Sequence, residues 1–220
     1  MQIGFRHLFI VRWHSPLSAA LAVKKGCTDT MKDTRRVKVE KERDVYTYAE
    51  LWHTSYCLLN KGRDDARGSF HLFMASIVFT AFTLEAYLNH VGPKLFSCWD
   101  DLESLSPKKK LNIITERLGV KIDNGIRPWQ IMKNLFGFRN DIAHGKSIKI
   151  KTSVILPLDQ HSDDIIFVQT RWEKYCTKNN AERAREDVES IIKTIHKASG
   201  IRNEYPFVCG FQTGGATVID

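Results

Sequence analysis

An arginine, an asparagine and a histidine stand within six residues of one another in the stretch FRNDIAHG, residues 138–145. Arginine can hold a phosphate through two parallel hydrogen bonds, and histidine can give or take a proton near neutral pH. The chain has no recognisable metal-ligand pattern, so these residue types could bind an anionic group such as a phosphate and transfer a proton beside it. A second interpretation involves no chemistry. In it Gly145 ends a helix and His144 lies near the negative end of the helix dipole.

The surrounding pattern predicts that this cluster lies on a helix over residues 128–144, turning by about 100° per residue. One apolar stripe is expected to pack into the chain's own core: Ile131, Leu135, Phe138 and Ile142. A second stripe lies about 110° away and consists of Met132, Phe136 and Ala143. Arg139 and His144 would flank this second stripe, about 140° apart, with Asn140 between them. A second stripe predicts a homodimer that brings two copies of the cluster to a shared cleft.

The elements around this helix are predicted to be mostly α, an up-and-down bundle of four to five helices. Helical periodicity covers residues 40–61 and 69–90, and Ser106 with Pro107 is a strong start signal for a helix that Gly119 ends. A final helix is expected from a cap at Asn180 to a stop at Gly200. Period-two alternation near 147–168 predicts a small β hairpin insertion, and residues 201–220 are expected to be a loosely attached tail.

Length and composition limit the number of domains and the kinds of partner to be expected. The chain has 220 residues and a formal net charge of +8, which indicates one domain over residues 31–200 with extensions. The charge favours an anionic partner, although a plain basic surface explains it equally well. Five widely spaced cysteines fit mostly buried, reduced thiols in a cytoplasmic protein without a metal or other cofactor.

Two segments bear on targeting. The longest uncharged run, residues 72–84, falls short of the roughly 20 residues that cross a bilayer, so a core helix and no membrane contact are expected. Residues 1–30 carry four basic residues and no acid before Asp29. They are interpreted as an extension that is disordered or not native, with a targeting peptide as the alternative.

The run from Arg139 to His144 resembles the R-(N/D/H)-x3-H form of the Rx4–6H signature of the HEPN family (higher eukaryotes and prokaryotes nucleotide-binding domain). The apolar segment 79–91 and the segment 171–192 are similar to helices of such domains, so that the resemblance covers residues 45–200. It implies a metal-independent endoribonuclease built on a dimer, in which the 2′-OH of RNA is the internal nucleophile. Such proteins are often toxins with a matching antitoxin, or antiviral effectors. His144 would be the acid/base, Arg139 would stabilise the phosphate, and Asn140 would orient the histidine or bind phosphate.

Two other functions stay open. The chain could be a non-catalytic HEPN-like module that binds RNA, nucleotide or protein, or a plain helical dimerisation domain. Lys146, with Lys149 and Lys151 on one face of the expected strand, could guide an RNA backbone or simply be solvated. Glu85 could pair with Arg139 or face solvent. Trp172 and Tyr175 are interpreted as packing residues.

Overall fold

The computed structural model describes residues 36–155, 157, 167–201 and 205–219. It confirms a mostly helical bundle with a small antiparallel pair of strands. The chain divides into a helical unit, Thr47–Val208, and a second unit that joins the residues before Thr47 to those after Val208. The interpretation of residues 1–30 as an extension lies outside the described residues.

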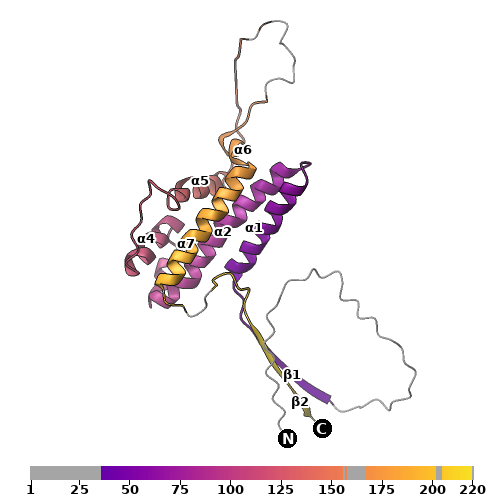
Figure 1. The fold of residues 1–220 in the computed structure, drawn as a ribbon, viewed down its shortest axis with the longest axis vertical. Helices are drawn as coiled ribbons and strands as arrows, with labels where there is room; N and C mark the ends of the chain where they lie inside the picture. Colours follow the sequence, from indigo (N-terminus) through magenta and orange to yellow (C-terminus); the bar gives the residue numbers. More distant parts are fainter. Residues whose placement is uncertain (1–35, 156, 158–166, 202–204, 220) are drawn as a thin grey trace, which may run out of the picture. The chain divides into compact units, whose positions relative to one another are not determined.

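The helical unit is built around its longest apolar helix. Its helices are α1 (Thr47–Asp64), α2 (Ser69–Leu95), α3 (Trp99–Leu102), α4 (Pro107–Arg117), α5 (Ile131–Ala143), α6 (Arg171–Tyr175) and α7 (Lys178–Ala198). Helices α1, α2 and α7 run alongside one another in Figure 1, and α2 also contacts α3, α4 and α5. Helix α2 is therefore the central element of the bundle, as its nearly all-round apolar sequence predicts.

Within the described residues, α2 is the one helix long and apolar enough to cross a membrane, although half of its most apolar window is buried inside the fold. Ile77, Leu84 and Leu88 of this helix are fully buried. The core helices of soluble proteins pass the same test of length and composition, so the finding is weak evidence for a membrane span.

Local start and stop signals fix several helix ends. Ser106 precedes α4 and Pro107 is its first residue, while Gly119 and Gly200 follow α4 and α7 with φ of +67°, a conformation that favours glycine. The cap of α7 was predicted one turn too late. Thr177 is the cap, and its Oγ1 accepts a hydrogen bond from the backbone N–H of Asn180 at 3.2 Å.

The strands are not where the alternating pattern predicted them. Residues 147–155 and 167–170 form no strand, and residues 156 and 158–166 lie outside the described part of the chain. The two observed strands, β1 (Arg36–Arg43) and β2 (Gln212–Ile219), pair antiparallel from opposite ends of the chain. Alternation needs a partner strand to become a sheet, and Ile148 is 66% exposed.

The cysteines are less buried than expected. Cys176 is buried, but Cys57 and Cys98 are exposed. The prediction of mostly buried thiols is therefore wrong for two of the described cysteines.

A buried arginine ties α7 to α1. Arg185 is only 8% exposed, and its guanidinium carbon lies 3.6 Å from the centroid of the Trp52 ring. Its Nη1 donates to the Trp52 carbonyl at 2.9 Å and also to Ser55 Oγ. Burial lowers the pKa of Arg185 to about 10, which leaves the side chain charged at neutral pH. Cation–π contact and the two acceptors stabilise this charge away from water.

Replacing Arg185 by Ala is expected to lower the free energy of unfolding by about 2–4 kcal/mol, because it removes the stem and leaves buried acceptors unpaired. Urea denaturation followed by circular dichroism measures the change. The neighbouring Arg183→Ala is the control, since the Arg183 side chain is 50% exposed and its loss should change stability by less than about 0.5 kcal/mol. Equal stability of the two variants would mean that the contacts of Arg185 with Trp52 and Ser55 do not stabilise the packing of α7 on α1.

Candidate functional site

Helix α5 carries the arginine, asparagine and histidine at its C-terminal end. Its predicted core stripe is largely correct, since Ile131, Leu135 and Phe138 are buried and Ile142 is half-buried. The Phe138 ring packs against Tyr175 of α6, with 5.2 Å between ring centroids. The core contacts of α5 fix the direction in which its polar end points.

The second stripe does not form an open patch. Met132 is 4% exposed and Phe136 is 8% exposed, while Ala143 is exposed. Helix α5 is packed among α2, α6 and α7, so the chain itself covers most of the helix circumference. The prediction that Met132, Phe136 and Ala143 await a partner subunit is therefore wrong as a description of the surface.

The Arg139 side chain is half-buried and firmly oriented. It forms an ion pair with Glu85 of α2, and its Nη1 donates to Asn140 Oδ1 at 2.9 Å. The solvent-facing alternative for Glu85 is wrong. Arg139 Nε is buried and has no hydrogen-bond partner among the described residues.

His144 is the residue directly after α5. Its backbone N–H donates to the Asn140 carbonyl at 2.9 Å, and its side chain is exposed. The helix-end interpretation is thus correct for the backbone. The His144 imidazole forms no hydrogen bond or ion pair with another of the described residues. The Asn140 amide oxygen accepts from Arg139, and no hydrogen bond joins the Asn140 side chain to His144 within the described part of the chain.

No hydrogen bond or ion pair joins Arg139 to His144 within the described part of the chain. Their positions differ by about 140° around an ideal helix axis, and Arg139 is held toward α2 by Glu85. The two side chains therefore lie on different sides of α5, and a second copy of the chain is one way to bring a histidine to Arg139.

The surface beside Arg139 is an apolar face of α2, which the sequence analysis missed because α2 looks apolar all round. Phe82 is 36% exposed, and the Arg139 guanidinium lies 5.9 Å from its ring centroid. Helical spacing places four half-buried residues on the same face: Ala75, Val78, Phe79 and Ala86. We call these five residues the α2 face. The exposed fractions along α2 are the signal that identifies it.

The remaining predicted residues are less organised. Lys146, Lys149 and Lys151 are all exposed. They do not lie in a strand, so the predicted shared strand face does not form. The described residues include no group of three or more His, Cys, Asp or Glu that could hold a metal ion.

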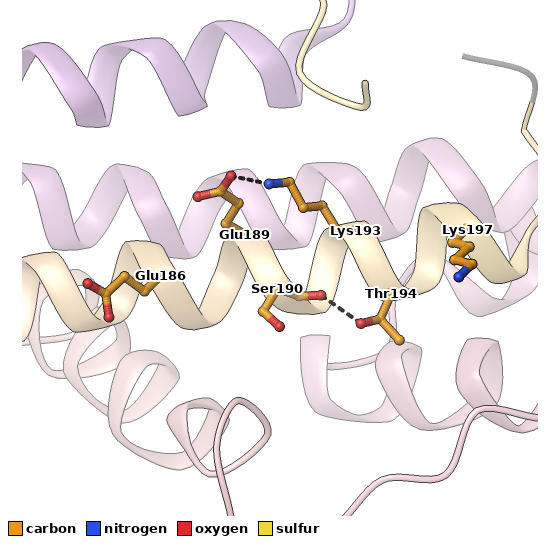
Figure 2. A pocket seen from close by; sticks show the side chains of 6 residues that line it. All are labelled: Glu186, Glu189, Ser190, Lys193, Thr194 and Lys197. Atoms are coloured by element: carbon orange, nitrogen blue, oxygen red, sulfur yellow. Dashed lines mark hydrogen bonds and ion pairs between the residues drawn. The ribbon is translucent and has the colours of Figure 1, made fainter. Parts of the chain in front are cut away.

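A hollow of about 490 Å³ runs along the exposed side of α7 (Figure 2). Its lining residues are Glu186, Glu189, Ser190, Lys193, Thr194 and Lys197. Glu189 and Lys193 pair with each other at 2.6 Å, and Thr194 Oγ1 donates to the Ser190 carbonyl at 2.8 Å. The hollow contains no residue of the α5 cluster, and its Glu186 pairs with Arg127 outside the lining at 2.9 Å.

Comparison with protein-family models, with curated proteins and with solved structures finds no match to this chain. The resemblance to the HEPN family therefore rests on the residues quoted above.

Proposed function

We propose that this protein is a metal-independent endoribonuclease whose site combines Arg139 and Asn140 with His144. The observation that carries the proposal is the contrast between these side chains. Arg139 is half-buried and fixed by Glu85 and Asn140, whereas the His144 imidazole is exposed. Transesterification of RNA needs an oriented cation at the phosphate and a group that transfers a proton, and Arg139 and His144 are residues of these two kinds.

In the proposed reaction, His144 takes the proton of the 2′-OH, and the resulting oxygen attacks the adjacent phosphorus. The bond from phosphorus to the 5′-oxygen breaks, and that oxygen receives a proton from a histidine or from water. The products are a 2′,3′-cyclic phosphate and a 5′-hydroxyl. Arg139 stabilises the charge that grows on the non-bridging oxygens, and its pair with Glu85 keeps it oriented for this role.

The separation of Arg139 and His144 around α5 leads us to place the reaction between two copies of the chain. In a two-fold dimer through the α2 face, Arg139 of one copy lies at the rim of the interface, where His144 of the other copy can approach it. The apolar residues of the α2 face supply the contact that Met132 and Phe136 cannot supply, since the latter are buried in their own subunit.

Replacing Phe82 by Glu is expected to convert the dimer to a monomer at micromolar concentration, because it places a charge at the centre of an apolar contact. RNA cleavage should fall with it, by about tenfold or more if the site is shared. Sedimentation velocity measures the assembly. Ile126→Glu is the control, since Ile126 is 58% exposed in a loop outside the α2 face. A wild type that sediments as a monomer would contradict the shared site.

The proposed activity is tested by incubating the purified protein with total RNA, and separately with single-stranded DNA, in the presence of EDTA. Fragmentation of RNA but not of DNA is expected, because DNA lacks the internal nucleophile. Cleavage of both, or a complete loss of RNA cleavage on adding EDTA, would contradict the proposal.

A non-catalytic RNA-, nucleotide- or protein-binding dimerisation module is the second candidate. The ion pair between Arg139 and Glu85 favours it, because this pair already gives Arg139 a structural role. Tight RNA binding without fragmentation in the same experiment would favour this module over the nuclease.

A further inference from the structure

A pocket of about 140 Å³ lies between α5 and α6. Its lining residues are Asn134, Phe138, Asp141, Arg171, Trp172 and Tyr175. It is smaller than the roughly 300–1,000 Å³ of sites that enclose a whole drug-sized ligand. Its size suits one ring system of a larger molecule whose remainder stays outside.

The aromatic wall of this pocket is firmly held. Helix α6 begins with a capping box, in which the Thr170 N–H donates to Glu173 Oε2 at 2.6 Å and the Glu173 N–H donates to Thr170 Oγ1 at 3.1 Å. Trp172 is half-buried, 6.3 Å from the Phe70 ring, and Tyr175 is half-buried against Phe138. Both residues therefore pack against neighbouring rings, as predicted, and both also line the pocket.

The polar groups of the pocket are available to a ligand. Asn134, Asp141 and Arg171 are exposed, and none of their side chains forms a hydrogen bond or ion pair with another of the described residues. The guanidinium of Arg171 lies beside Gly137 of α5, where an added Cβ would be 3.9 Å from Arg171 Nη2. A free cation, a free carboxylate and a free amide therefore surround one half-open aromatic pocket.

The pocket lies on the side of α5 that leads to His144. Gly137, Asp141 and His144 are spaced by four and three residues, which places them in one row along the helix. Asp141 precedes His144 by only about 4.5 Å along the axis. A base bound against Asp141 and a phosphate at His144 would therefore be close enough to belong to adjacent parts of one RNA chain.

We propose that this pocket is a nucleobase subsite, which holds a base next to the cleaved phosphate and selects one with an exocyclic amino group; this inference rests on the proposed ribonuclease function. The base lies against Trp172, since stacking on an aromatic ring is how single-stranded RNA is commonly held. Asp141 accepts a hydrogen bond from the amino group, as carboxylates do from N4 of cytosine. Arg171 contacts the adjoining phosphate, which gives this position a cation separate from Arg139.

The test uses His144→Ala protein, which is expected to cleave RNA about 10²–10⁴-fold more slowly than the wild type. It measures fluorescence anisotropy with labelled oligocytidylate and oligouridylate of about six nucleotides. These two pyrimidines differ chiefly in the amino group that cytosine has and uracil lacks. Oligocytidylate is expected to bind about tenfold more tightly than oligouridylate. Adding Asp141→Asn should reduce the difference to about twofold or less, and Arg171→Ala should weaken both oligonucleotides.

Trp172→Ala is expected to weaken binding of both oligonucleotides by about 5- to 100-fold, and Trp172→Phe should retain most of the affinity because it keeps a stacking surface. Lys174→Ala, an exposed cation of α6 that does not line the pocket, is the control for general loss of charge. Circular dichroism of each variant checks that α6 and the bundle remain folded. Affinities that do not differ between these variants, or no binding at all, would overturn the subsite.

Failure of the subsite and failure of the proposed function are distinguishable in parallel assays of the same variants in the wild-type His144 background. RNA cleavage whose base preference is unaffected by Asp141→Asn and Trp172→Ala would refute the subsite but not the ribonuclease function. Base-selective binding without cleavage would refute the ribonuclease function but not the base-binding pocket.

Discussion

Replacing His144 by Ala is expected to lower the rate of RNA cleavage by about 10²–10⁴-fold, the usual contribution of a general acid–base group. The fold should be unaffected, because the side chain is exposed and only its backbone N–H takes part in ending α5. Initial rates on a fluorogenic RNA oligonucleotide measure the first effect, and thermal unfolding measures the second.

His53→Ala is the matched control for this prediction, since His53 is an exposed histidine on α1. Its cleavage rate should equal that of the wild type. If His144→Ala and His53→Ala cleave RNA equally fast, His144 is only the residue that follows the helix, and the proton carrier lies elsewhere.

Replacing Arg139 by Ala is expected to reduce cleavage by about 10²–10³-fold, the effect of losing one fixed donor that stabilises the transition state. Unlike the histidine variant, it should also lower the free energy of unfolding, by about 1–3 kcal/mol, because Glu85 is left without its partner in a half-buried position. Arg139→Lys should recover little activity, since one ammonium cannot contact Glu85, Asn140 and a phosphate in the geometry of a guanidinium.

The double variant Arg139→Ala with Glu85→Ala separates these two effects. Removing both charges should restore much of the stability while leaving RNA cleavage as slow as in Arg139→Ala. Arg117→Ala, at the exposed end of α4, controls for the loss of one positive charge. Full activity of the double variant would show that Arg139 serves the fold alone.

Local patterns in the sequence predict those parts of the fold that local physics determines. Ser106 and Pro107 start α4, and glycines follow α4 and α7, because capping and positive φ depend only on neighbouring residues. The core stripe of α5 is predictable for the same reason. The cap at Thr177 could have been identified too, since a threonine three residues before Asn180 is an equally good acceptor.

Features that depend on distant parts of the chain were not predictable in this way. The pairing of Arg36–Arg43 with Gln212–Ile219 joins the two ends of the chain, and no short pattern specifies such a partner. Met132 and Phe136 appear as a separate stripe on an isolated helix, and only the arrangement of α2, α6 and α7 around α5 explains their burial. The α2 face could not be predicted, because the sequence of an apolar helix does not tell which of its apolar residues are covered by a neighbour.

The candidate site was predictable as a set of residue types but not as an arrangement. Arg139, Asn140 and His144 are recognisable from spacing, yet the sequence does not tell which of them Glu85 would engage. The pocket between α5 and α6 depends on Arg171 and Trp172, which lie about 30 residues after the cluster and reach it only through the fold.

The central claim is that the 2′-OH of RNA is the nucleophile, with His144 as proton carrier. The most direct measurement is to map the ends produced from a defined RNA oligonucleotide in EDTA, beside the same oligonucleotide with one 2′-deoxy nucleotide at the cleaved position. The account predicts a 2′,3′-cyclic phosphate and a 5′-hydroxyl from the first and no cleavage at that position in the second. A 5′-phosphate product, or equal cleavage of the 2′-deoxy substrate, would contradict it.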